Sequence, residues 1–266
     1  MADRPLLNRG LRRAIAGHQQ RFYGLEYAPE SGVAVSTGAI QALAALPGLL
    51  EPGDEVIALD PCHDSCAACI AMAGALRVPV ILRPPAFRPE PAELHRGITP
   101  RTRLLLLNSP HDRTGSVLQD EDLTAIAQLA VERDQLIISD EVYEHLVYDG
   151  VRHRPSGSLP GMRARTVSVS SAGKTFSFTG WKVGLVPAPP KLAAAVQTDK
   201  QYLTFTRPFQ HAVAEALRLP IMFHADPEAG RSLVRFAFCK RADVVREPGA
   251  RQKALAGGPV PPSVIP

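Results

Sequence analysis

Several short runs of this chain are apolar at every position, and they limit what it can fold into. Leu104–Leu107 reads LLLL, and Leu136–Ile138 reads LII before Ser139 and Asp140. Strands that are apolar throughout are expected only where both faces of a sheet are covered. Because such runs alternate with helix-like stretches, the sequence predicts an α/β fold with a mostly parallel sheet.

The predicted elements follow from this alternation. Strands are expected at Glu55–Asp60, Arg77–Arg83, Arg103–Asn108, Gln135–Asp140 and Thr166–Ser170. Helices are expected at Ala39–Leu50, Asp64–Ala73, Asp120–Arg133 and Lys191–Leu217, the last interrupted at Pro208. The arginine-rich start, residues 1–21, has no apolar core and predicts a solvated helix, not a targeting signal. Residues 242–266, rich in Pro, Gly and Ala, are predicted to be disordered.

Composition excludes several classes of protein. Hydrophobic residues make up 45% of the 266 and charged residues 21%, as in ordinary globular proteins, and no apolar run is long enough to span a bilayer. The net charge is +4, but basic residues are dispersed without interleaved aromatics, which argues against nucleic-acid binding. Three of the four cysteines crowd into eight residues, which does not suit a disulfide framework and favours a cytoplasmic setting.

Polar residues gather just after several predicted strands. They are Pro61–Asp64, Asn108–Gly115, Asp140–Tyr143 and Ser171–Lys174. In an open α/β sheet, ligands bind outside the carboxyl ends of the strands. The sequence therefore predicts one functional edge.

The segment Ser168–Gly184, SVSSAGKTFSFTGWKVG, admits three interpretations. A P-loop would need a glycine where Ser168 stands. Ser171 and Lys174 match the S-x-x-K motif of penicillin-binding enzymes, but the accompanying S-D-N and K-T-G motifs do not occur. The third interpretation is a lysine that forms a Schiff base, Lys174, with Lys182 eight residues later.

This third pattern, with ISDEVY and STGAIQAL, resembles the class I/II aminotransferases of the fold-type I pyridoxal-phosphate enzymes, in particular the kynurenine, methionine and succinyl-diaminopimelate branch. The resemblance runs from Leu11 to Leu217 and resumes at Arg231–Lys240. It implies a three-layer αβα large domain (1–217) without the usual N-terminal segment, and a remnant of a small domain (218–241). It also implies amino-group transfer between an amino acid and a 2-oxo acid, in a homodimer.

The resemblance also assigns roles to residues. Lys174 would bind the cofactor, pyridoxal 5′-phosphate, and move the substrate proton; Asp140 would face the pyridine nitrogen, and Tyr143 the phenolic oxygen. Arg235 would bind the substrate carboxylate. The cofactor phosphate would be held near a helix start, by Gly38, Ala39, Ser171 and Lys182.

Several positions depart from the family pattern. Asp112 stands where the family has an asparagine that donates to the cofactor oxygen, so an ionised Asp112 would need compensation, for example by Arg113. His63 stands where an aromatic ring stacks on the cofactor, and a histidine can stack there too or merely begin a helix. Ile40 replaces a hydroxyl residue that contacts the phosphate.

Two alternatives remain open. The chain could be an impaired aminotransferase remnant that at most binds the cofactor, since much of the small domain is expected to be missing. More remotely, Cys62, Cys66 and Cys69 have the spacing of a radical-SAM iron–sulfur motif. Cysteines that pack a helix face are the plainer explanation.

Overall fold

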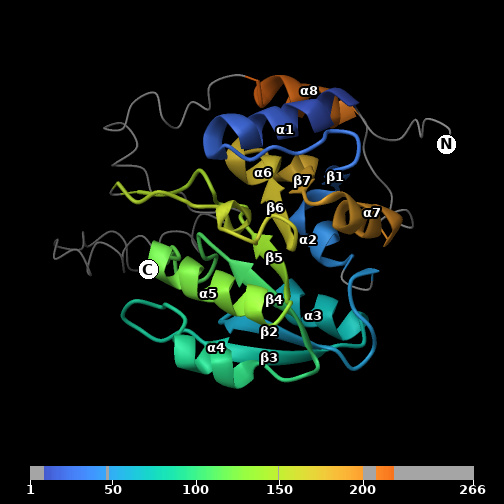
Figure 1. Ribbon diagram of the computed structural model, residues 1–266. Helices are drawn as coiled ribbons and strands as arrows, with labels where there is room; N and C mark the ends of the chain where they lie inside the picture. Colours follow the sequence, from blue (N-terminus) through green and yellow to red (C-terminus); the bar gives the residue numbers. More distant parts are fainter. Residues whose placement is uncertain (1–8, 46–47, 149, 200–207, 219–266) are drawn as a thin grey trace, which may run out of the picture. The chain divides into compact units, whose positions relative to one another are not determined.

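The computed structural model describes residues 9–45, 48–148, 150–199 and 208–218 (Figure 1). Arg235, Cys239 and the expected tail at 242–266 lie outside these ranges, as does almost all of the expected small-domain remnant at 218–241. Those expectations stay predictions. No helix of the described residues combines the length and the apolar character that crossing a membrane requires.

One seven-stranded sheet forms the centre of the described fold, in the order β1-β7-β6-β5-β4-β2-β3. The strands are β1 (Val33–Ser36), β2 (Glu55–Asp60), β3 (Leu76–Ile81), β4 (Thr102–Asn108), β5 (Leu136–Asp140), β6 (Thr166–Ser171) and β7 (Gly184–Pro187). Strands β2 to β6 pair in parallel, and β7 pairs antiparallel with both β6 and β1. The predicted mostly parallel sheet and its five predicted strands are confirmed.

Helices cover both faces of the sheet. They are α1 (Arg9–Tyr23), α2 (Gly38–Leu43), α3 (Asp64–Met72), α4 (Pro91–Gly97), α5 (Asp120–Glu132), α6 (Ala172–Thr175), α7 (Pro190–Asp199) and α8 (Pro208–Ala216). Along β2, Val56 and Ala58 pack toward α2, α3 and α7, whereas Ile57 and Leu59 pack toward α4 and α5. Because alternate side chains of one strand enter different cores, the sheet is the middle of three layers, as predicted.

Helix α1 corrects the prediction of a solvated N-terminal helix. It lies against α8 and the sheet (Figure 1), and Leu11, Ile15 and His18 are each at most 1% exposed. These residues recur at helical spacing on one face, while Arg13 and Arg21 stay exposed on the other. The prediction was wrong because it weighed the arginines and overlooked the amphipathic spacing, which buries one face of the helix.

Candidate functional site

The polar segments predicted to share an edge do meet at the carboxyl ends of β4, β5 and β6. These strands are neighbours, and Asn108 of β4 pairs with Asp140 of β5 at their last residues. Asn108 donates its side-chain N–H to the Asp140 carbonyl at 3.0 Å and accepts the Asp112 N–H at 2.7 Å. The sequence placed Asn108 at the start of a polar segment after an apolar run but assigned it no role. Asn108 fixes the loop that carries Asp112.

Lys174, Tyr143 and Asp112 form a chain of contacts at this edge. The Lys174 ammonium donates to the Tyr143 hydroxyl at 3.1 Å, and that hydroxyl donates to Asp112 Oδ1 at 2.6 Å. Lys174 Nζ also lies 5.0 Å from the centre of the Tyr143 ring. Lys174 comes from α6, directly after β6, and Tyr143 from the turn after β5. Three predicted site residues are thus brought together.

Asp140 is the buried acid of the site, 9% exposed at the end of β5. The pKa of Asp140 is raised to about 7, chiefly by burial and in smaller part by the charges of Asp112 and Glu141. A hydrogen bond from the Val142 N–H and the charge of Lys174 act in the opposite direction. Asp140 is therefore poised to hold a proton near neutral pH.

Arg113 offsets the negative charge of Asp112 only modestly. Its Nε lies 3.4 Å from Asp112 Oδ2, while its NH2 group lies 2.8 Å from Asp64. The Arg113 side chain is 39% exposed, so solvent screens its charge. The carboxylate of Asp112 is held chiefly by Tyr143.

Gly38 and Lys182 lie together at the start of α2. Gly38 has a φ of +77°, and a Cβ built on it would lie 3.8 Å from Lys182 Cδ. Strand β7 can approach the start of α2 because Gly184 has no side chain. A Cβ on Gly184 would lie 2.7 Å from the carbonyl atoms of Gly38. Backbone amides at this start can face an anion, with Lys182 beside them.

The other predicted site residues are placed as follows. Ala39 is half-buried, Ile40 is 51% exposed, and Ser171 lies half-buried at the junction of β6 and α6. His63 begins α3, where its Nδ1 accepts the Ser65 N–H at 3.2 Å. The helix-start role considered for His63 is thus observed, and nothing in this contact demonstrates stacking.

The structure does not support the iron–sulfur alternative. Cys66 and Cys69 are buried in the core under α3, and Cys62 packs against that core. Burial raises the pKa of the Cys66 thiol to about 12 and raises that of Cys69 also, which disfavours the thiolates that bind iron. Among the described residues, the groups able to hold a metal do not include these thiols.

One surface hollow of the described residues lies elsewhere. It has a volume of about 930 Å³ and is lined by residues such as Asp54, Thr102 and Gln135, which stand at the amino ends of β2, β4 and β5. Lys174 lies at the opposite ends of the strands. Polar chemistry, rather than cavity size, therefore identifies the candidate site.

Comparison with known proteins matches residues 7–233 to the family model described as aminotransferase class I and II. A probable N-succinyldiaminopimelate aminotransferase of Mycobacterium tuberculosis is 49% identical over 212 residues, covering 78% of this chain and 53% of the relative. The methionine aminotransferase of Escherichia coli is 41% identical, covering 87% and 59%. The chain thus spans little more than half the length of the curated relatives it matches.

Solved structures agree with the fold. The structure of N-succinyldiaminopimelate aminotransferase from Mycobacterium tuberculosis superposes with a TM-score of 0.81 at 42% identity, covering 94% of this chain and 63% of that one. An aromatic aminotransferase from Pyrococcus horikoshii superposes with a TM-score of 0.81 at 35% identity.

Proposed function

This chain belongs to the aminotransferase class I and II family, and on that premise we propose that it transfers an amino group between an amino acid and a 2-oxo acid, with pyridoxal 5′-phosphate as its cofactor. One observation carries the proposal: the Lys174 amine lies 3.1 Å from the Tyr143 hydroxyl, at the edge where Asp140 is buried. When bound, this cofactor supplies an aldehyde that combines with amines and a ring that accepts electrons.

The groups present at this edge fit that cofactor. Lys174 offers a primary amine, and Asp140 offers a buried carboxyl group whose pKa of about 7 suits a shared proton with a pyridine nitrogen. Gly38, with its positive φ, and Lys182 offer amides and a cation suited to a phosphate. Ala39 and Ser171 complete the proposed phosphate contacts.

Each residue then has a defined task. Lys174 Nζ would take the proton from the substrate Cα and return it during the transfer. The Tyr143 hydroxyl would orient that amine, since it already contacts it. Asp140 would keep a proton on the ring nitrogen, and Arg235, which lies outside the described residues, is proposed for the substrate carboxylate.

The substrates and the partner subunit belong to the proposal as well. Relatives are named for N-succinyldiaminopimelate, methionine, and kynurenine with oxoglutarate, so these compounds form the first substrate panel. A homodimer is proposed on family grounds, and a cytoplasmic location is proposed because three cysteines crowd into eight residues.

A second candidate is a cofactor-binding protein without turnover. The observation that favours it is Asp112: its carboxylate takes the Tyr143 hydroxyl hydrogen at 2.6 Å, where the family pattern has a donor amide. A carboxylate beside an anionic cofactor oxygen is repulsive, and the unpaired contact costs on the order of a few kcal/mol.

The visible spectrum separates these functions. The purified chain is mixed with pyridoxal phosphate, dialysed, and scanned before and after addition of each amino acid of the panel. We expect a retained band that one amino acid shifts toward the pyridoxamine form. Lys174→Ala should lose the retained band, whereas the exposed Lys191→Ala should keep it. A retained band that no amino acid shifts supports the second candidate, and a Lys174→Ala protein that keeps the band would overturn both.

A further inference from the structure

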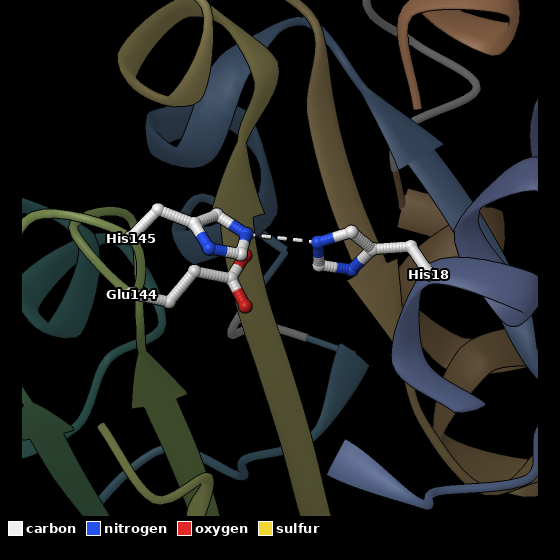
Figure 2. A group of neighbouring side chains, drawn as sticks. All are labelled: His18, Glu144 and His145. Carbon is white, nitrogen blue, oxygen red and sulfur yellow. Dashed lines mark hydrogen bonds between the residues drawn. The ribbon is translucent and has the colours of Figure 1, made fainter. Parts of the chain in front are cut away.

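A second cluster of ionisable side chains lies between α1 and the turn that follows β5. Figure 2 shows the His18 ring, from α1, facing the His145 ring, with the Glu144 carboxylate beside them. The two Nε2 atoms are 2.8 Å apart. One ligand atom from each of the three residues lies within 4.8 Å of the other two. This convergence joins residues that are 127 positions apart in the chain.

The cluster is closed to solvent. His18, Glu144 and His145 are 1%, 3% and 6% exposed. Ser170 of β6 donates its hydroxyl to Glu144 Oε1, which holds the carboxylate in place. No lysine or arginine of the described residues forms an ion pair with Glu144. The negative charge of this buried carboxylate therefore has no permanent cation beside it, and such a charge is normally paired or bound to a metal.

We propose that His18, Glu144 and His145 form a binding site for one zinc ion, independent of the aminotransferase chemistry. Two imidazole nitrogens and one carboxylate oxygen are a ligand set that zinc uses, with a water molecule in the fourth position. Calcium and magnesium prefer oxygen ligands, so they fit less well.

The geometry requires a small adjustment. With bonds of about 2.0–2.1 Å, tetrahedral ligands stand roughly 3.3 Å apart, so the two Nε2 atoms would separate by about half an ångström. The histidines belong to different elements, α1 and the turn after β5, so a small shift of one side chain achieves this.

The metal would tie α1 to the segment that carries Tyr143. Glu144 and His145 follow Tyr143 directly, and Ser170 precedes Ser171 at the proposed phosphate site. The site therefore lies next to the Lys174 edge and is not part of it.

The competing explanation is a plain hydrogen bond between neutral rings. In that arrangement one Nε2–H donates to the other Nε2, and Glu144 keeps the Ser170 hydroxyl, with the His153 ring as a third imidazole near it. The two explanations differ in whether a metal binds at all, which a direct measurement decides.

The test uses the full chain after treatment with a chelator, titrated with zinc against a coloured zinc indicator. We expect one zinc per chain, and affinity at least about tenfold weaker in His18→Gln and in Glu144→Gln. The control is His95→Gln, because His95 is exposed on α4 and bonds only the Pro91 carbonyl. Wild type and control should bind alike. Failure of the wild-type chain to bind zinc, or equal binding by His18→Gln, would overturn the site.

A second measurement keeps the test decisive if a variant does not fold. Cobalt added to the wild-type chain should give the visible absorption of a tetrahedral nitrogen and oxygen site, without the near-ultraviolet band of thiolate ligands. A thiolate band would assign the metal to one or more of the four cysteines and refute the proposal. Magnesium and calcium should not compete with cobalt.

Discussion

The Tyr143 hydroxyl lies between Asp112 and Lys174: it donates to Asp112 Oδ1 at 2.6 Å and receives the Lys174 ammonium at 3.1 Å. One phenol thus links the amine of the site to a carboxylate where the family resemblance predicts an amide. Whether the Tyr143 hydroxyl donates to Asp112 or to the cofactor bears directly on whether the chain turns over substrate.

Asp112→Asn should strengthen cofactor binding. The asparagine carbonyl still accepts the Tyr143 hydroxyl, while its N–H₂ group can donate to the cofactor oxygen and the repulsive charge disappears. We expect retention of pyridoxal phosphate to improve by about tenfold, equivalent to roughly 1.4 kcal/mol. Equilibrium dialysis with absorbance detection measures this. Glu26→Gln removes the same charge from an exposed site and should change nothing. Equal affinity in Asp112→Asn and wild type would show that Asp112 does not oppose the cofactor.

Tyr143→Phe should weaken the site without unfolding the chain. The ring remains to pack, but Lys174 loses its hydroxyl contact and Asp112 loses its donor. We expect cofactor affinity to fall by about tenfold, and the free energy of unfolding to change by no more than about 1 kcal/mol. Tyr148→Phe, at a ring that is 48% exposed, is the matched control. Dialysis measures the cofactor affinity, and urea unfolding measures the free energy of unfolding. An unchanged affinity would show that Tyr143 does not contribute to the cofactor site.

The stability of the cofactor-free chain should fall between about pH 4 and pH 7. Burial raises the pKa of Asp140 to about 7 in the folded state, against roughly 3.9 when unfolded. The folded state therefore binds more protons in this window, so its stability is complete below the lower pKa and is lost as pH rises through the higher one. The effect is on the order of a few kcal/mol.

Asp140→Asn tests this pH dependence. The amide can still accept the Val142 N–H but does not ionise, so its stability should change less between pH 5 and pH 8 than that of wild type. Urea unfolding at both pH values, without cofactor, provides the measurement. Parallel stability profiles for the two proteins would show that Asp140 does not titrate in this range.

Gly184→Ala should disturb the start of α2. Its Cβ would overlap Ser36 Oγ and lie 2.7 Å from the Gly38 carbonyl, so the backbone must move. We expect a loss of about 1–3 kcal/mol in the free energy of unfolding, together with weaker phosphate binding. Gly180→Ala has open space around the new atom and should be close to neutral. If both variants unfold at the same urea concentration as wild type, the close approach of β7 to α2 is wrong.

Short elements at the edge of the sheet were beyond prediction from sequence. Strands β1 and β7 have four residues each and were missed, because four apolar positions carry too little periodicity to identify a strand. They form through pairing across the sheet, since β7 pairs antiparallel with both β1 and β6. The predicted helix Ala39–Leu50 is likewise wrong in length, since α2 ends at Leu43.

The sequence by itself determined the parallel core and the edge of the sheet at which the polar segments gather. Continuous apolar runs can be satisfied only inside a covered sheet, and polar residues after them must gather where parallel strands end. That logic located Asp140, Lys174 and the loop with Asp112.

Only the tertiary structure decided which of these side chains touch. The bond between Tyr143 and Asp112 spans 31 residues and the His18–His145 contact spans 127. Such contacts depend on how α1 and the loops fold back over the sheet, which local patterns do not encode.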